Sequence, residues 1–196
     1  LFKDLEIHSL MSNIQQVHNY EKDTPKVQQD HTKKNYKIIH TPNELENLIG
    51  SMYKSDMVSV DIESTDINPN CAKIVGISIS MEKDSGYYIP FIFPGIESNK
   101  KHTLNVSQIL DAISPILESE EINKCGQNIK YDCLVLSRYD IHLNNIVFDT
   151  MVAEYLLHPE KNSYKLDYLS LDYLNYKMVP IEELIGSGIH QKSMAD

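Results

Sequence analysis

The chain has 196 residues, 41% of them hydrophobic, which is enough for one ordinary globular domain with an extension. Its net charge of −10, from 18 basic and 28 acidic residues, argues against a module that grips duplex nucleic acid through its own positive field. No apolar run reaches the length of a membrane span, and the first residues lack the features of a signal peptide, so we expect a cytoplasmic protein without a membrane partner. The three cysteines are widely spaced and predict neither a zinc site nor a disulfide framework.

The first 35 residues differ in composition from the rest of the chain. Residues 1–14 carry apolar side chains at helical spacing, whereas residues 15–35 are polar and have almost no apolar anchors. The polar tract has the composition of a linker. We therefore expect a compact domain over residues 36–196.

That domain begins with a pattern of strands. A short strand is predicted at residues 36–40, and Thr41-Pro-Asn-Glu44 is typical of a capped start for a helix that runs to about Tyr53. Three strands follow at residues 57–63, 73–80 and 86–91. Strands in direct succession favour a meander.

The second half of the domain is mostly helical. Helices are predicted at residues 107–118, 129–138, 149–157 and 166–174, with a short strand at 122–125 after the first of them. Asp149 follows an apolar strand and opens a helix, so its expected role is that of an N-cap. A meander followed by packed helices predicts an α/β fold built on a mixed sheet.

Two carboxylates at the end of the strand 57–63 are the first candidate site. Asp61 and Glu63 are two positions apart in a strand, so they project from the same side of the sheet. Side by side they repel each other unless a cation lies between them, and hard oxygen ligands suit Mg²⁺ or Mn²⁺. The alternative is that they are solvated or capping residues before the turn-rich segment 64–69.

A second candidate site lies where the strand 122–125 gives way to a helix. Gly126 permits a close backbone approach, and Asn128 can cap the helix or bind a ligand. Asp132, four residues later, is expected to face back towards the strand end. The structural alternative is an N-cap at Asn128 and a favourable charge at Asp132 near the positive end of the helix.

Taken together, the two sites resemble a known family. Asp61-x-Glu63, followed about seventy residues later by Asn128-x-x-Tyr-Asp132, resembles the first two motifs of the DEDD superfamily of 3′–5′ exonucleases. Five segments, in order along residues 36–196, are similar to the proofreading domain of bacterial DNA polymerase I, a family A polymerase. They are Val75-Gly-Ile-Ser78, Tyr88-Ile-Pro90, Gly126-Gln-Asn-Ile-Lys-Tyr-Asp132, Phe148-Asp-Thr-Met151 and Leu166-Asp-Tyr-Leu169.

The resemblance implies a ribonuclease H-like mixed sheet flanked by helices, and a two-metal nuclease of DNA replication and repair. Asp61, Glu63 and Asp132 would hold two Mg²⁺ or Mn²⁺ ions around the 3′-terminal phosphate of single-stranded DNA. Its substrate-binding residues would be Asn128, Gln127, Thr65 and Ile67. It also implies a polymerase domain downstream in the parent chain, and residues 1–14 resemble the end of a preceding 5′ nuclease domain.

One family feature is not matched. The third motif, Tyr-x-x-x-Asp, supplies a fourth carboxylate and is expected beyond Gly188, but the chain stops at Asp196. Tyr168 and Asp172 have the spacing of this motif, but they precede its expected position and lie in the predicted helix 166–174. On that helix they fall on the side without leucines, so we expect them to be exposed to solvent.

Two other functions remain open at this stage. A ribonuclease D-like exonuclease would share the first two motifs and act on RNA, whose 2′-hydroxyl such a site would sense. The second is a non-catalytic domain that binds strand ends. The missing fourth carboxylate favours this function, whereas the presence of Asp61, Glu63 and Asp132 argues against it. The first predicts faster cleavage of RNA than of DNA, and the second predicts affinity without turnover.

Overall fold

The structure is a computed structural model, which describes residues 34–91 and 104–181, together with residues 183 and 186. The predictions for residues 1–14, and for residues 15–33 of the expected linker, fall outside the described residues. Asn35 is the first residue of the first strand.

In the part of the chain that the structure describes, six strands form one mixed sheet in the order β1-β4-β3-β2-β5-β6. Their bounds are β1 Asn35–Ile38, β2 Met57–Ser64, β3 Ile74–Ser80, β4 Ser85–Pro90, β5 Asn123–Gly126 and β6 Ile146–Asp149. The antiparallel pairs β2/β3 and β3/β4 confirm the predicted meander, while β1, β5 and β6 add parallel pairs at the two sides. The prediction of a mixed sheet is therefore confirmed.

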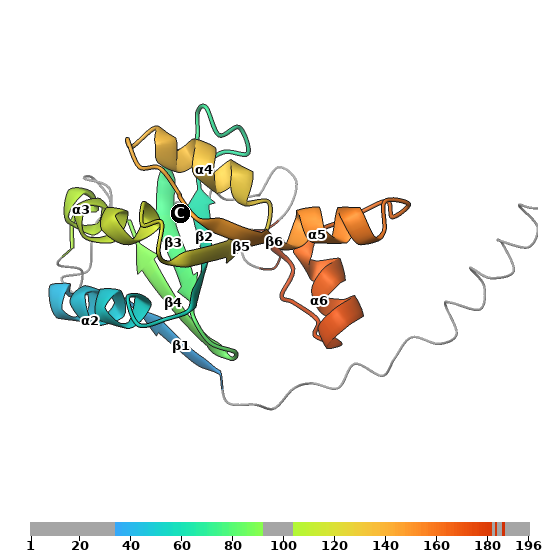
Figure 1. The fold of residues 1–196 in the computed structure, drawn as a ribbon, viewed down its shortest axis with the longest axis horizontal. Helices are drawn as coiled ribbons and strands as arrows, with labels where there is room; N and C mark the ends of the chain where they lie inside the picture. The colour runs from blue at the N-terminus through green and yellow to red at the C-terminus, as the bar shows by residue number, and fades with distance from the viewer. Residues whose placement is uncertain (1–33, 92–103, 182, 184–185, 187–196) are drawn as a thin grey trace, which may run out of the picture.

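Within the described residues, five helices flank the sheet: α2 Pro42–Met52, α3 Val106–Leu117, α4 Ile129–Ser137, α5 Thr150–Leu157 and α6 Leu166–Leu174. Helices α2 and α3 begin at capping boxes, in which Thr41 and Asn105 accept from the backbone N–H three residues later. These two helices pack together at one end of the sheet, and α5 and α6 lie at the other end (Figure 1). The predicted bounds differ from these by at most two residues, because helix and strand ends depend on local hydrogen bonding.

The two faces of β2 have different surroundings. Val58, Val60 and Ile62 are buried in a single hydrophobic core that also takes in side chains of α2, α3 and α4. Burial of each such side chain contributes roughly 1.5–3 kcal/mol. Because strand side chains alternate, Asp61 and Glu63 lie on the opposite face, as predicted.

None of the helices within the described ranges has both the length and the apolar character needed to cross a membrane.

Candidate active site

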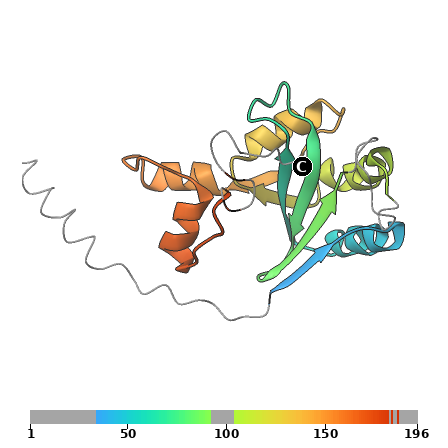
Figure 2. The same cartoon turned by 180° about the vertical axis from the view of Figure 1, so that it is seen from behind.

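Asp61 and Glu63 lie on the floor of a cleft with a volume of about 1340 Å³. Its floor is the face of the sheet that is turned away from the core, and its opposite wall is α6 with the segment after it. In both ribbon views α6 stands away from α2 and α3 (Figure 2). Tyr88 lines the cleft from the sheet, and Ser170, Leu174 and Tyr176 line it from α6 and the segment after it.

The two carboxyl groups of β2 are held in an environment that favours their protonated forms. Burial raises the pKa of Asp61, and a hydrogen bond with Glu63 partly offsets this rise. Burial also raises the pKa of Glu63, and the charge of Asp61 adds to that rise. A cation between them would reverse both effects.

The Tyr88 side chain lies beside Glu63 on the same face of the sheet. Gly76 of β3 is the direct register partner of Glu63, and a Cβ built at Gly76 would collide with the Tyr88 phenol. Burial raises the pKa of Tyr88, and the charge of Glu63 raises it further. Glycine at position 76 therefore makes room for an aromatic hydroxyl next to the carboxylates, a feature that sequence reasoning missed.

Asp132 reaches the same end of β2 from helix α4. The pairing of β5 with β2 ends at Ser59↔Cys125, and beyond it the Ile62 backbone N–H donates to Asp132 Oδ1 at 2.9 Å. Asp132 is 2% exposed, and burial, followed by the charge of Asp61, raises its pKa to about 7. The structure thus brings the third predicted carboxylate to the residue between Asp61 and Glu63.

The donor set suits a hard divalent ion, since three carboxyl groups at raised pKa lie around one strand end. No group of three His, Cys, Asp or Glu side chains in residues 34–91 and 104–181 is arranged to hold a metal ion as the side chains stand. Asp61 and Glu63 share a hydrogen bond instead.

The junction between β5 and α4 turns sharply at Asn128. Its φ is 56°, in the left-handed region, and its side chain makes no capping hydrogen bond within the described chain. The structural alternative, a side-chain N-cap at Asn128, is therefore wrong, because Asp149 accepts from the Asn128 and Ile129 backbone N–H groups instead. The expected N-cap role of Asp149 is confirmed on α5. At Gly126 a Cβ would lie 2.9 Å from the Val60 carbonyl oxygen, which confirms the predicted close approach.

The remaining predicted substrate residues lie around these carboxyl groups in different ways. Ile67 is 95% exposed in the loop after β2. Thr65 closes the base of that loop, since its Oγ1 accepts from the Lys73 N–H at 3.0 Å. The Gln127 amide donates to the Tyr164 carbonyl at 2.8 Å and accepts from the Thr150 hydroxyl, so it is engaged within the protein.

Helix α4 anchors the loop that carries Ile67. Tyr131 Oη lies 2.5 Å from Ser64 Oγ and also donates to the Asp66 carbonyl oxygen. Arg138 donates to the Ala72 carbonyl oxygen at the other end of the loop. This anchoring was not predicted, although the Tyr-Asp pair at 131–132 was part of the recognised motif.

Tyr168 and Asp172, which fit the string of the third motif, are at the surface as expected. Asp172 is paired with Lys161 at 2.9 Å, and its side chain is 53% exposed. The leucine sector of α6 differs from the expectation, because Leu169 is buried but Leu174 is 73% exposed.

Lys124 of β5 lies in the interior of the protein, out of reach of a phosphate. Its side chain is fully buried, and Nζ donates to the carbonyl oxygens of Ser119 and Ile122. The paired carbonyl groups compensate for burying the charged end.

Comparisons with known proteins show which family the chain belongs to. A family profile described as 3′–5′ exonuclease matches residues 36–189. DNA polymerase I of Borreliella burgdorferi is 34% identical over 150 residues, which are 76% of this chain and 16% of that protein. The chain therefore spans about a sixth of the length of this relative.

Two solved structures show the same fold at low sequence identity. Brucella melitensis NrnC with bound Mg²⁺ has a TM-score of 0.52 and 20% identity, covering 76% of this chain and 65% of that one. Trypanosoma brucei RNase D, in complex with RNA U12, has a TM-score of 0.59 and 14% identity, covering 74% of this chain and 49% of that one. The ribonuclease H-like fold is confirmed. Together with the profile match over most of its length, these findings show that the chain belongs to the 3′–5′ exonuclease family of hydrolytic nucleases found in DNA polymerase I.

Proposed function

We propose that this chain is the proofreading 3′–5′ exonuclease part of a DNA polymerase I, and that it hydrolyses the 3′-terminal phosphodiester of single-stranded DNA. The observation that carries the proposal is the meeting of Asp61, Glu63 and Asp132 around one end of β2 at raised pKa. Such an arrangement is costly for stability and suits a cation site that serves chemistry.

The residues have distinct proposed roles. Asp61, Glu63 and Asp132 would hold two Mg²⁺ or Mn²⁺ ions, which when bound supply an activated water and stabilise the leaving 3′ oxygen. The Ile62 N–H holds Asp132 in place for this, at 2.9 Å. Ile67, on its anchored loop, would wedge against the terminal base, with Asn128, Gln127 and Thr65 helping to position the nucleotide.

Proofreading follows from the kind of strand that such a site accepts. A mismatched 3′ end frays more easily than a paired one, and the site takes an unpaired strand. A polymerase domain elsewhere in a longer parent chain would then return the corrected end to synthesis. The similarity to a DNA polymerase I supports this role in DNA replication and repair.

A second candidate is an exonuclease that acts on RNA. The similarity of the fold to RNase D in complex with RNA favours it, although at 14% identity this likeness concerns the fold alone. A third candidate, a domain that binds strand ends without cutting them, is favoured by the mutual hydrogen bond of Asp61 and Glu63.

The test is degradation of 5′-labelled single-stranded DNA and of RNA of the same sequence, with Mg²⁺ or Mn²⁺. It uses this chain, a form extended through the downstream reading frame, and the Asp61→Ala variant of each. Asp111→Ala is the control, because Asp111 lies exposed on α3, on the opposite face of the sheet. We expect stepwise shortening from the 3′ end, DNA cut faster than RNA, and a loss of at least about 100-fold in Asp61→Ala alone, which corresponds to roughly 3 kcal/mol.

The other candidates give different results in the same assay. Faster shortening of RNA than of DNA would favour the ribonuclease reading. Binding of either strand without shortening, by both the short and the extended form, would overturn the enzymatic proposal.

A further inference from the structure

We propose that Asp149 is a positioning residue of the candidate active site. Its carboxylate ties the start of α4 to the start of α5 and thereby fixes Asn128 and Asp132. The inference rests on the proposed function, but the effect of Asp149 on the position of α4 and Asp132 can be tested separately.

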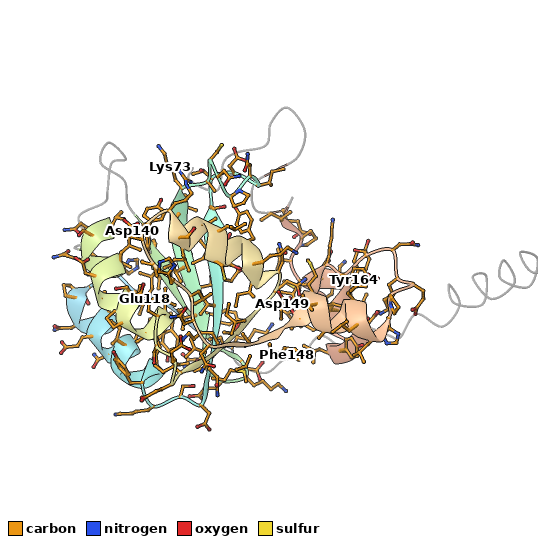
Figure 3. The ribbon with its side chains drawn as sticks, turned by 45° about the horizontal axis from the view of Figure 1, so that its top comes forward. Lys73, Glu118, Asp140, Phe148, Asp149 and Tyr164 are labelled. Carbon is orange, nitrogen blue, oxygen red and sulfur yellow. The ribbon has the colours of Figure 1, made fainter. Side chains whose placement is uncertain are left out.

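The Asp149 side chain accepts four backbone hydrogen bonds. Oδ1 accepts from Asn128 at 3.1 Å, from Met151 at 2.8 Å and from Val152 at 3.2 Å. Oδ2 accepts from Ile129 at 2.9 Å. Figure 3 places Asp149 where the sheet meets α5. An ordinary N-cap serves one helix, whereas this carboxylate serves two helices whose first residues, Ile129 and Thr150, are 21 positions apart.

Helix α4 depends on this carboxylate because its own N-cap residue does not cap it. The first N–H groups of a helix lack partners inside the helix, and the Asn128 side chain provides none. Asn128 also stands at a φ of 56°, which costs free energy for a residue other than glycine. The two bonds from residues 128 and 129 to Asp149 stabilise both the turn and the first turn of α4.

The placement of Asp132 follows from that first turn. Asp132 is the fourth residue of α4, and its contact with Ile62 requires the helix to begin at the observed point and in the observed direction. The strands support the same connection, since Gly126 of β5 is the register partner of Asp149. Thr150 adds a bond to the Gly126 carbonyl oxygen at 3.3 Å. A change at Asp149 is therefore transmitted to β2 through α4.

The first test variant distinguishes the effect of Asp149 on α4 from its effect on α5. Asp149→Ser keeps a short oxygen that can cap α5 but cannot extend to α4. Asp149→Asn is the second variant: it keeps the shape but replaces one acceptor oxygen with a donor that faces backbone N–H groups. Thr41→Val is the matched control, because it removes the N-cap bond of α2 to Glu44, on an element outside the cleft.

The first measurement is hydrogen exchange of the Ile62 amide, which reports whether Asp132 still accepts its bond. We expect exchange to rise by at least about tenfold in Asp149→Ser and in Asp149→Asn. Thr41→Val should lower the melting temperature and leave the relative protection of Ile62 unchanged. Unchanged Ile62 protection in both Asp149 variants would overturn the inference.

The second measurement is binding of Mn²⁺ to the same proteins, without substrate. Loss of a residue that orients a metal ligand typically weakens binding about 10- to 100-fold, and we expect a loss of that size in both Asp149 variants but not in Thr41→Val. If the unaltered chain binds no Mn²⁺, the proposed function fails, while the Ile62 result still decides the role of Asp149. If Ile62 loses protection and Mn²⁺ binding does not change, Asp149 is structural only and the positioning role is wrong.

Discussion

At the scale of single residues, Asp132 is the side chain in which stability and the proposed function oppose each other most clearly. A carboxyl group that is 2% exposed, and close to Asp61, is held at a pKa of about 7 against an ordinary value of 3.8. Because the folded state binds this proton more tightly than the unfolded state, folding becomes less favourable as the pH rises from about 4 to about 7. A buried carboxyl that lowers stability at neutral pH is understandable where a cation is to be bound.

We therefore predict that Asp132→Asn stabilises the protein at neutral pH. The amide keeps the Oδ1 acceptor for the Ile62 N–H and cannot ionise. At about 1.4 kcal/mol for each pKa unit, the gain in unfolding free energy at pH 8 is on the order of 4 kcal/mol, and it disappears below about pH 4. Urea unfolding at pH 4, 6 and 8 measures it. An equal stability difference at all three values would contradict the prediction.

At the scale of elements, a polar network holds α6 against α5. Glu154 of α5 is 3% exposed, and it forms an ion pair with Lys161 at 2.7 Å and accepts from the Tyr173 hydroxyl at 2.6 Å. Lys161 also pairs with Asp172, so one lysine connects both helices. Since α6 forms a wall of the cleft, this network sets the width of the space above Asp61 and Glu63.

Lys161→Met is expected to loosen α6. It would leave the Glu154 carboxylate buried without its cation, which is more destabilising than the loss of an exposed pair. Amide exchange within α6 should rise by at least about tenfold, with little change in α3. Asp172→Asn is the control and should have a small effect, because that partner is half exposed.

The double variant Glu154→Gln/Lys161→Met distinguishes the effect of the buried Glu154 charge from the effect of losing the Lys161 contact between α5 and α6. It removes the buried charge together with its cation, so we expect α6 protection to return towards the original value. Protection as low as in Lys161→Met alone would show that the lost contact of Lys161, and not the unpaired charge of Glu154, loosens α6.

At the scale of the whole molecule, the negative charge must be reconciled with a nucleic acid ligand. The chain carries a net charge of −10, and the floor of its cleft is acidic. Such a surface repels phosphates unless cations are present, and the metals would therefore serve binding as well as chemistry.

The acidic floor of the cleft predicts a reversal in strand binding on substitution of Asp61. In EDTA, Asp61→Ala should bind single-stranded DNA at least as tightly as the unaltered chain, because one repelling charge is gone. With Ca²⁺, an oxygen-preferring ion, the unaltered chain should bind at least about tenfold more tightly than the variant. Fluorescence anisotropy at about 0.1 M salt, where charge interactions reach roughly 10 Å, measures both. Weaker binding by the variant in EDTA would contradict this account.

Features that depend on local direction and spacing could be predicted from the amino-acid sequence alone. Alternation along β2 placed Asp61 and Glu63 on one face, and the Thr41 capping box marked the start of α2. The order of strands and helices was sufficient for the mixed sheet, because successive antiparallel strands pair with their neighbours. The motif at residues 126–132 indicated the second half of the site.

Contacts between distant segments could be identified only in the folded chain. The bond from Ile62 to Asp132 spans 70 residues, and the bonds from Asn128 and Ile129 to Asp149 span 21 and 20. None of these bonds can be predicted from the periodicity of apolar residues, which indicates the direction of a side chain but not the residue that it contacts. The burial of Lys124 and the exposure of Leu174 were missed for the same reason, since both depend on which other element covers that position in the folded chain.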